Sequence, residues 1–148
     1  MTENVLDFIN GRWTDANTNE RLNVMNPAQG AAIAQVVMSP REVVAEAVEA
    51  GHVAFQEWRR TPVTERIQYL FKLKMLLEDH VDEIGKIITN ECGKTFKESV
   101  GELRRGIENV EVACGMPSLM QGYNNEDIAR GIDEHMFRQP LGVVTAIT

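Results

Sequence analysis

The chain ends in the run Leu141 to Thr148, with the sequence LGVVTAIT, which is almost entirely apolar. In a soluble protein such a run is typical of a strand that is buried on both faces of a parallel sheet. A parallel sheet needs helices that connect its strands and cover its faces, so this run predicts an α/β fold. The sequence provides no helix after this strand to cover it. Because an exposed apolar strand is an aggregation hazard, we expect this boundary to be a truncation of a larger protein.

Four helical patterns precede this run almost without a break. Ser39 stands before Pro40 and Glu42, which predicts an N-cap, a proline at the first helical position and a capping-box acid. Apolar residues then recur at intervals of three and four as far as Trp58, and a turn is expected before Pro62. A second helix is predicted from Ile67, Leu70, Phe71, Leu73 and Leu77, and a third, ended by Gly93, from Val81, Ile84, Ile87 and Ile88. A capping box of Thr95 and Glu98 begins the fourth helix, whose apolar stripe is Val100, Leu103, Ile107, Val110 and Cys114.

Strand patterns lie on both sides of the helical run. Asn10-Gly11, between short apolar runs, predicts a hairpin because both turn residues tolerate positive φ. Asn26-Pro27 predicts a second turn, and residues 32–37 predict a further strand. Residues 116–130 are rich in Gly, Asn, Pro and Ser and predict a loop. Residues 135–139 and 141–148 predict two strands joined at Pro140.

Charge and composition limit the partners of the chain. Fifteen Lys and Arg against 22 Asp and Glu give a net charge of −7, and no basic run exceeds two residues, which argues against nucleic acid. No stretch reaches the roughly 20 apolar residues of a membrane span, so we expect no membrane association and a cytoplasmic protein. Cys92, Cys114 and three scattered histidines lack the spacing of a metal site or a nucleophile–base pair, so we expect neither metal nor catalytic residues here.

Gly93-Lys94-Thr95 has the residues that end a phosphate-binding loop. That motif needs a glycine where Ile88 stands, and it follows a strand rather than a helix. We therefore expect Gly93 to end one helix and Thr95 to cap the next. No Gly-x-Gly-x-x-Gly fingerprint occurs in the chain.

Two glycines, Gly101 and Gly106, interrupt the fourth helical pattern, and each costs about 1 kcal/mol relative to alanine. We therefore expect another group to approach this backbone closely. Arg105 lies off the main apolar stripe, on the face of Gly101 and Glu108. Its guanidinium could bind a carboxylate with two hydrogen bonds. Spacing alone favours the alternative, a surface pair of Arg104 or Arg105 with Glu108.

Six short motifs are distributed along the chain: Phe8–Trp13, Asn26–Ala28, Ala54-Phe55-x-x-Trp58, Glu65-Arg66, Glu91–Lys94 and Arg138–Val144. Their order and spacing resemble those of the aldehyde dehydrogenase superfamily over essentially the whole chain. Residues 101–111 and 117–120 further resemble the CoA-acylating methylmalonate-semialdehyde dehydrogenases, which also handle malonate semialdehyde. The resemblance implies NAD-dependent oxidation of a carboxylate-bearing aldehyde through a cysteine thioester, followed by decarboxylation and acyl transfer to coenzyme A.

The resemblance also implies roles for residues and segments. The arginine that matches Arg105 faces the substrate carboxylate in these relatives, and residues matching Ile147 and Thr148 lie close to the nicotinamide. By the same resemblance, residues 1–130 form the strand and helical portion of the NAD-binding domain. Residues 131–140 form an oligomerisation strand of a homodimer or tetramer, and residues 141–148 form the truncated start of a Rossmann-like sheet.

The family's oxyanion-stabilising asparagine and its nucleophilic cysteine belong to segments beyond Thr148. The resemblance therefore implies an inactive amino-terminal piece of an active dehydrogenase. Two alternatives stay open. The chain could be a truncated gene product that acts as an oligomerisation or interaction module, or it could come from an aldehyde dehydrogenase that yields free acid rather than acyl-CoA.

Overall fold

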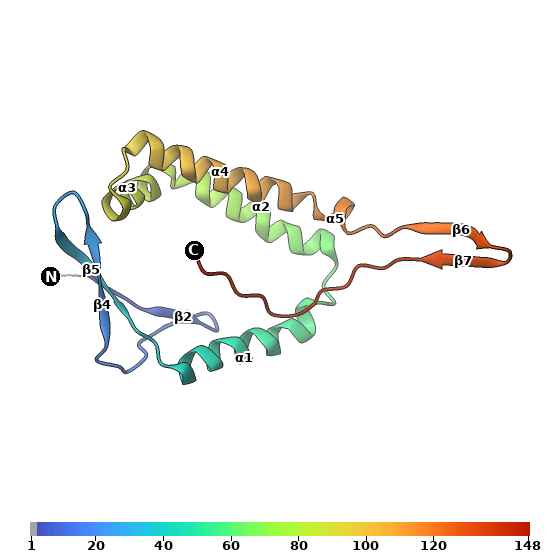
Figure 1. Ribbon diagram of the computed structural model, residues 1–148, viewed down its shortest axis with the longest axis horizontal. Coiled ribbons are helices and arrows are strands. Elements are labelled where there is room, and N and C mark those ends of the chain that lie inside the picture. Colours follow the sequence, from blue (N-terminus) through green and yellow to red (C-terminus); the bar gives the residue numbers. More distant parts are fainter. Residues whose placement is uncertain (1–2) are drawn as a thin grey trace.

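The computed structural model describes residues 3–148, and Met1 and Thr2 lie outside this range. The strands are β1 (Glu3–Val5), β2 (Asp7–Ile9), β3 (Arg12–Thr14), β4 (Arg21–Asn26), β5 (Ala31–Val37), β6 (Asn124–Ala129) and β7 (Ile132–His135). The helices are α1 (Arg41–Trp58), α2 (Val63–Asp79), α3 (Val81–Cys92), α4 (Phe96–Cys114) and α5 (Met116–Leu119). The first five strands gather at one end, the β6–β7 hairpin projects from the opposite end, and the last residues run back between α1 and α2 in the view of Figure 1. The α/β class predicted from the sequence is confirmed.

The first five strands form two small sheets. In the larger one, β5 lies at the centre, parallel to β1 and antiparallel to β4, while β2 and β3 form a separate hairpin. The predicted turn of that hairpin is confirmed, with φ of 50° at Asn10 and 76° at Gly11. The turn at Asn26 is also confirmed, because its side-chain oxygen accepts a hydrogen bond from the Ala28 N–H at 2.9 Å. The sequence pattern did not identify β1 or β4.

The four long helices occupy the predicted places, but the start of α1 differs in detail. Pro40 is the N-cap of α1, and no side chain caps this helix. Ser39, predicted as the N-cap, instead donates its hydroxyl to Asp7 Oδ2 at 2.5 Å. The predicted capping box with Glu42 is therefore wrong, because a partner from the β2 strand takes the hydroxyl.

The boundary between α3 and α4 matches the prediction. Gly93 ends α3 in the left-handed conformation, with φ of 71°. Thr95 is the N-cap of α4, and Thr95 and Glu98 form the complete capping box. A Cβ atom at Gly93 would lie 2.9 Å from Pro27 Cγ, so this boundary packs against the β4–β5 turn.

The carboxyl-terminal part differs from the prediction. Residues 116–130 are not a loop, because they form α5 and β6, and the predicted strand at 135–139 is displaced to Ile132–His135. The residues of β6 are mostly polar and all exposed, so no alternation marks the strand, which exists through its pairing with β7. Residues 141–148 are extended but form no strand, because no other strand of residues 3–148 lies beside them. Val143 instead contacts α1, where a Cβ atom at Gly51 would lie 3.4 Å from Val143 Cγ2.

The packed centre of the structure lies where α2, α3 and α4 meet. Ile107 of α4 is 2 % exposed, and Ser99 of α4 is fully buried. The Ser99 and Thr89 hydroxyls lie 2.9 Å apart and satisfy one another between α4 and α3. Gly85 of α3 is also buried and allows the two helices to approach closely.

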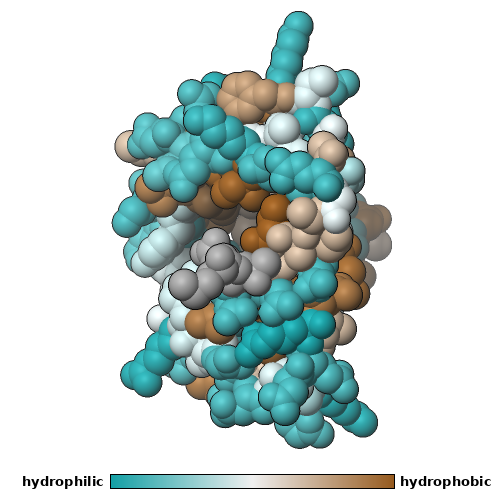
Figure 2. Space-filling view, turned by 90° about the vertical axis from the view of Figure 1, so that its left-hand side faces the viewer, coloured by the Kyte–Doolittle hydropathy of each residue, from teal (hydrophilic) through white to brown (hydrophobic). Residues whose placement is uncertain are grey.

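Most apolar side chains lie outside this centre. The chain leaves 11839 Å² of accessible surface, whereas a compact monomer of this length leaves about 7,600 Å². Leu141 is 99 % exposed and Ile147 is 100 % exposed, and α1 presents Val44 and Trp58 to the outside. Figure 2 shows hydrophobic side chains gathered around the hollow in the middle of one face. These faces have no partner among residues 3–148.

In the part of the chain that the structure describes, no helix combines the length and the apolar character that a membrane crossing requires.

Candidate functional site

The first turns of α4 border a shallow depression of about 400 Å³. It is lined by Lys94, Glu98, Gly101, Glu102 and Arg105. The capping box fixes where α4 begins, and helical spacing then places residues 98, 101, 102 and 105 on one face. A single local sequence signal therefore positions four of the five lining residues.

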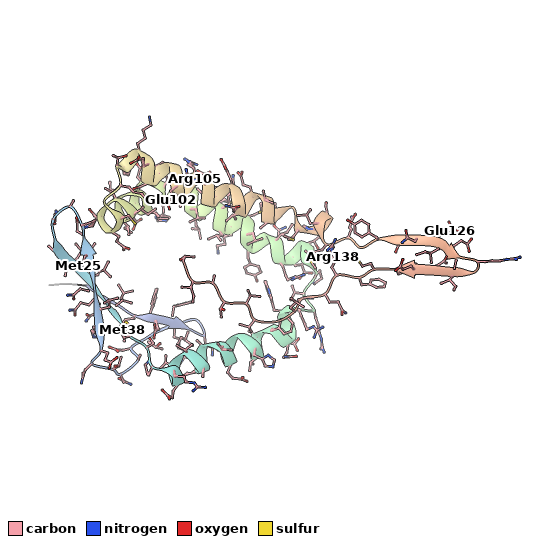
Figure 3. All side chains as sticks on the ribbon, in the orientation of Figure 1. Met25, Met38, Glu102, Arg105, Glu126 and Arg138 are labelled. Carbon is pink, nitrogen blue, oxygen red and sulfur yellow. The ribbon has the colours of Figure 1, made fainter. Side chains whose placement is uncertain are left out.

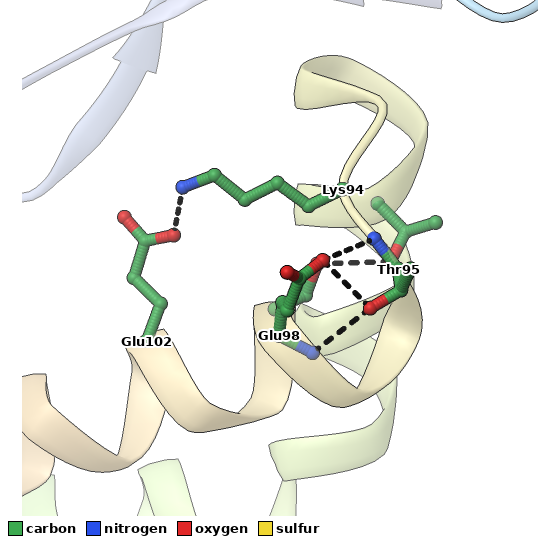
Figure 4. Close-up of polar contacts among 6 residues, drawn as sticks. Lys94, Thr95, Glu98 and Glu102 are labelled. Carbon is green, nitrogen blue, oxygen red and sulfur yellow. Dashed lines mark hydrogen bonds and ion pairs between the residues drawn. The ribbon is translucent and has the colours of Figure 1, made fainter.

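The acidic side chains of this depression are already bonded. The Glu98 carboxylate accepts hydrogen bonds from the Thr95 N–H at 3.2 Å and the Thr95 hydroxyl at 2.8 Å, and these bonds hold the pKa of Glu98 below its usual range. The Lys94 ammonium donates a hydrogen bond to Glu102 (Figure 4). This bond lowers the pKa of Glu102 and raises the pKa of Lys94.

Arg105 differs from its neighbours because its charge is not neutralised. Among residues 3–148, no carboxylate lies within ion-pair distance of its exposed guanidinium. The predicted alternative, a pair of Arg104 or Arg105 with Glu108, is not formed, because Arg104 pairs with Glu78 of α2. Figure 3 shows Glu102 and Arg105 together on α4. The depression thus offers one free guanidinium with several hydrogen-bond donors.

The two glycines of α4 have open space beside them. A Cβ atom at Gly101 or at Gly106 would meet nothing within 4 Å among the described residues. The expected close approach to this backbone is therefore not made within the part of the chain that the structure describes. At Gly101 the consequence is room next to the Arg105 guanidinium, because both residues line the depression.

The structure does not bring the other two predicted site residues to Arg105. Ile147 and Thr148 lie in the extended tail and do not line the depression. Ile147 is fully exposed among the described residues, so its side chain is open to an apolar partner. The site residues predicted from the sequence therefore lie in two separate places: Arg105 in the charged depression, and Ile147 and Thr148 in the extended tail.

The cysteines and histidines are dispersed. Cys92 is exposed and Cys114 is partly exposed. His80 contacts Glu83 at 2.7 Å, the His135 ring contacts Asn124 at 2.9 Å, and the His52 ring lies 3.5 Å from the Gln56 amide, so the hydrogen-bond contacts of the three rings are with residues other than cysteine. No group of three metal-ligating side chains occurs among residues 3–148.

Lys94 and Glu102 are the lining residues that the sequence pattern did not identify. Gly93-Lys94-Thr95 indicates only a helix end and a cap, and no helical spacing relates residue 94 to residue 102. The sequence did contain one signal for the Lys94–Glu102 contact. A lysine directly before an N-cap has a side chain long enough to reach the second turn of the following helix.

Comparison with known proteins gives a consistent result. The sequence model described as "Aldehyde dehydrogenase family" matches residues 13–148. Malonate-semialdehyde dehydrogenase 2 of Geobacillus thermodenitrificans is 44 % identical over 99 % of this chain and 30 % of its own length. The malonate-semialdehyde dehydrogenase of Lacticaseibacillus casei is 45 % identical over 96 % of this chain and 29 % of its own length. This chain thus spans about 30 % of the length of the curated relatives that it matches.

Solved structures that resemble this chain agree with the sequence comparison. The methylmalonate-semialdehyde dehydrogenase of Oceanimonas doudoroffii has a TM-score of 0.89 and 40 % identity, covering 95 % of this chain and 28 % of that protein. A protein of Sinorhizobium meliloti 1021 complexed with NAD has a TM-score of 0.90 and 30 % identity, covering 96 % of this chain and 29 % of that protein.

Proposed function

Since this chain belongs to the aldehyde dehydrogenase family, we propose that it supplies the amino-terminal part of an NAD-dependent, CoA-acylating malonate- or methylmalonate-semialdehyde dehydrogenase. The names and identities of the relatives support the substrate class. In the proposed reaction an aldehyde that carries a carboxylate is oxidised to a thioester, loses CO₂ and passes its acyl group to coenzyme A. The cytoplasmic location expected from the sequence belongs to the same proposal.

The observation that carries the proposal is the free guanidinium of Arg105. A carboxylate-bearing aldehyde needs a cation that is not already neutralised, and planar Arg can bind a carboxylate with two parallel hydrogen bonds. The open backbone at Gly101 gives such a ligand room beside Arg105. Arg105 therefore binds and orients the substrate carboxylate in this proposal, and a neutral aldehyde gains nothing from it.

The place proposed for the cofactor is the tail. The fully exposed Ile147 fits an apolar contact with a planar ring, and Thr148 lies next to it. When bound, NAD supplies the hydride acceptor of the oxidation. The chain's own contribution at this point is a surface for the nicotinamide.

The domain division and the assembly are also proposals. Residues 131–140, which include β7, supply an oligomerisation strand, and residues 141–148 begin a Rossmann-like sheet. The projecting hairpin of β6 and β7 supports the first point, because a two-stranded sheet leaves both outer edges unpaired (Figure 1). The accessible surface is larger than that of a compact monomer of this length, which supports the proposal that further protein covers the exposed apolar faces.

The test uses the complete enzyme with Arg105→Leu. We expect the KM for malonate semialdehyde to rise at least tenfold, the effect of losing hydrogen bonds to a charged group, with a much smaller change for propanal. An equal effect on both aldehydes would remove Arg105 from the site. Formation of acetyl-CoA from malonate semialdehyde supports acyl transfer to CoA, whereas formation of the free acid favours the non-acylating alternative.

A second experiment separates the enzyme piece from an interaction module. The 148-residue chain, incubated with malonate semialdehyde, NAD and CoA, should produce no NADH above buffer. A coding frame that continues past Thr148 supports the enzyme piece, whereas a stop codon there supports a module that pairs with full-length subunits through its helices and its terminal strand.

A further inference from the structure

The charges of Lys94 and Arg105 both act on the Glu102 carboxylate. Lys94 extends from the turn between α3 and α4 and donates its hydrogen bond to Glu102 (Figure 4). Glu102 and Arg105 are three residues apart on α4, where side chains of opposite charge are neighbours and attract each other. The hydrogen bond from Lys94 and, to a smaller extent, the charge of Arg105 both lower the pKa of Glu102. Two cations therefore compete for one acidic group.

The other acid of the depression does not take part in this competition. The Glu98 carboxylate is held by the N–H and the hydroxyl of Thr95. Glu102 is thus the one acidic side chain lining the depression that could neutralise Arg105. Among residues 3–148 it pairs with Lys94, and Arg105 is left without an ion pair.

We propose that Lys94 is a positioning residue that keeps Arg105 available, because it holds the Glu102 carboxylate that would otherwise compete with the carboxylate of the substrate. This inference rests on the proposed function, in which Arg105 binds that carboxylate. Lys94 acts through Glu102 and does not need to touch the substrate. The lining carries two cations and two carboxylates, so its formal net charge is zero. What the Lys94–Glu102 pair leaves available is a guanidinium without an ion pair among residues 3–148, which can bind the carboxylate of a monoanionic aldehyde with two hydrogen bonds.

The consequence is an unusual pattern of variant effects. If Lys94 were removed, Glu102 would be released and would swing to Arg105 within the same helix face. If Glu102 lost its charge, removal of Lys94 would release no carboxylate beside Arg105. Loss of the lysine should therefore be harmful only while Glu102 keeps its charge, a dependence that a merely structural ion pair does not produce.

The experiment measures KM and kcat for malonate semialdehyde and for propanal in the complete enzyme, with four variants: Lys94→Met, Glu102→Gln, the double variant and Arg105→Leu. We expect Lys94→Met to raise the KM for malonate semialdehyde about tenfold, the cost of competition by a charged hydrogen-bond partner, with a smaller change in kcat. Glu102→Gln should not raise this KM. The double variant should return to within about threefold of the wild type. Lys97→Met, which removes an exposed lysine from the first turn of α4, is the matched control and should not change this KM.

The possible outcomes distinguish a failure of the proposed role of Lys94 from a failure of the proposed function. If Arg105→Leu is selective for malonate semialdehyde but the double variant is as impaired as Lys94→Met, the role of Lys94 is wrong and the proposed function stands. The same conclusion follows if Glu102→Gln raises the KM as much as Lys94→Met does. If Arg105→Leu affects both aldehydes equally, both proposals are wrong.

Discussion

The backbone of Gly122 lies against the carbonyl group of Met136 at the base of the β6–β7 hairpin, so closely that a Cβ atom at position 122 would overlap the Met136 carbonyl oxygen. The neighbouring hydrogen bond from the Met136 N–H to the Tyr123 carbonyl, at 2.9 Å, holds the two arms of the hairpin together. Only glycine fits at this point, because the obstacle is backbone rather than the end of a flexible side chain.

We therefore expect Gly122→Ala to force the arms of the hairpin apart at their base. If the hairpin mediates assembly, the complete enzyme carrying Gly122→Ala should form smaller assemblies, as measured by size-exclusion chromatography with light scattering. Gly106→Ala is the control, because a Cβ atom there meets nothing within 4 Å among the described residues. Unchanged assembly in Gly122→Ala would contradict the proposed role of the hairpin.

A second glycine controls the contact between α3 and α4. A Cβ atom at Gly85 would lie 3.0 Å from both Phe96 Cε2 and Val100 Cγ2. Gly85→Val should loosen this contact at a cost of about 1–3 kcal/mol, the usual effect of overpacking. Hydrogen exchange of the α3 and α4 amides in the complete enzyme would report the loss as faster exchange. Gly106→Ala should instead slow exchange in α4, since alanine stabilises a helix interior by about 0.5–1 kcal/mol relative to glycine.

The capping box makes the start of α4 sensitive to acid. The hydroxyl and the N–H of Thr95 lower the pKa of Glu98 below its ordinary value of 4.5. A depressed pKa in the folded state stabilises folding above the ordinary value, and this contribution is lost as the pH falls through the lowered pKa. Glu98→Gln should therefore be less stable than the wild type above about pH 5, and the difference should shrink at lower pH.

Thermal unfolding of the complete enzyme and of this variant between pH 3 and pH 7 measures the effect. Glu108→Gln is the matched control, because Glu108 is an exposed glutamate of the same helix without a side-chain hydrogen bond among residues 3–148. A difference between wild type and Glu98→Gln that stays constant with pH would show that the carboxylate form does not contribute.

Local signals explain which parts of the fold the sequence predicted. The hairpin at Asn10-Gly11, the helix end at Gly93 and the cap at Thr95 each depend on residues within four positions of one another, and each is observed. The cap at Ser39 failed because its hydroxyl bonds Asp7, which lies 32 positions away. A pattern read along the chain contains no information about such a partner.

Pairing explains the remaining differences. The strand β6 has no alternation of apolar and polar residues, so only its ladder with β7 and the turn at Gly131 define it. The apolar pattern of residues 141–148 predicts a strand, but a strand also needs a neighbour, and residues 3–148 provide none. At the candidate site, helical spacing found Arg105 but not Lys94, because Lys94 reaches Glu102 across the start of a helix.

Arg104 and Arg105 are adjacent in sequence, but we expect their substitution to have different effects on stability and on KM. Arg104 pairs with Glu78 and joins α4 to α2, whereas Arg105 lines the depression. The Arg104–Glu78 pair is partly exposed, so Arg104→Leu should cost at most about 1 kcal/mol of stability and leave the KM for malonate semialdehyde unchanged. Steady-state kinetics and thermal unfolding of Arg104→Leu and Arg105→Leu, measured side by side, test this division. If Arg104→Leu raises the KM as much as Arg105→Leu does, the effect of Arg105 belongs to the general positive charge of this helix rather than to a carboxylate site.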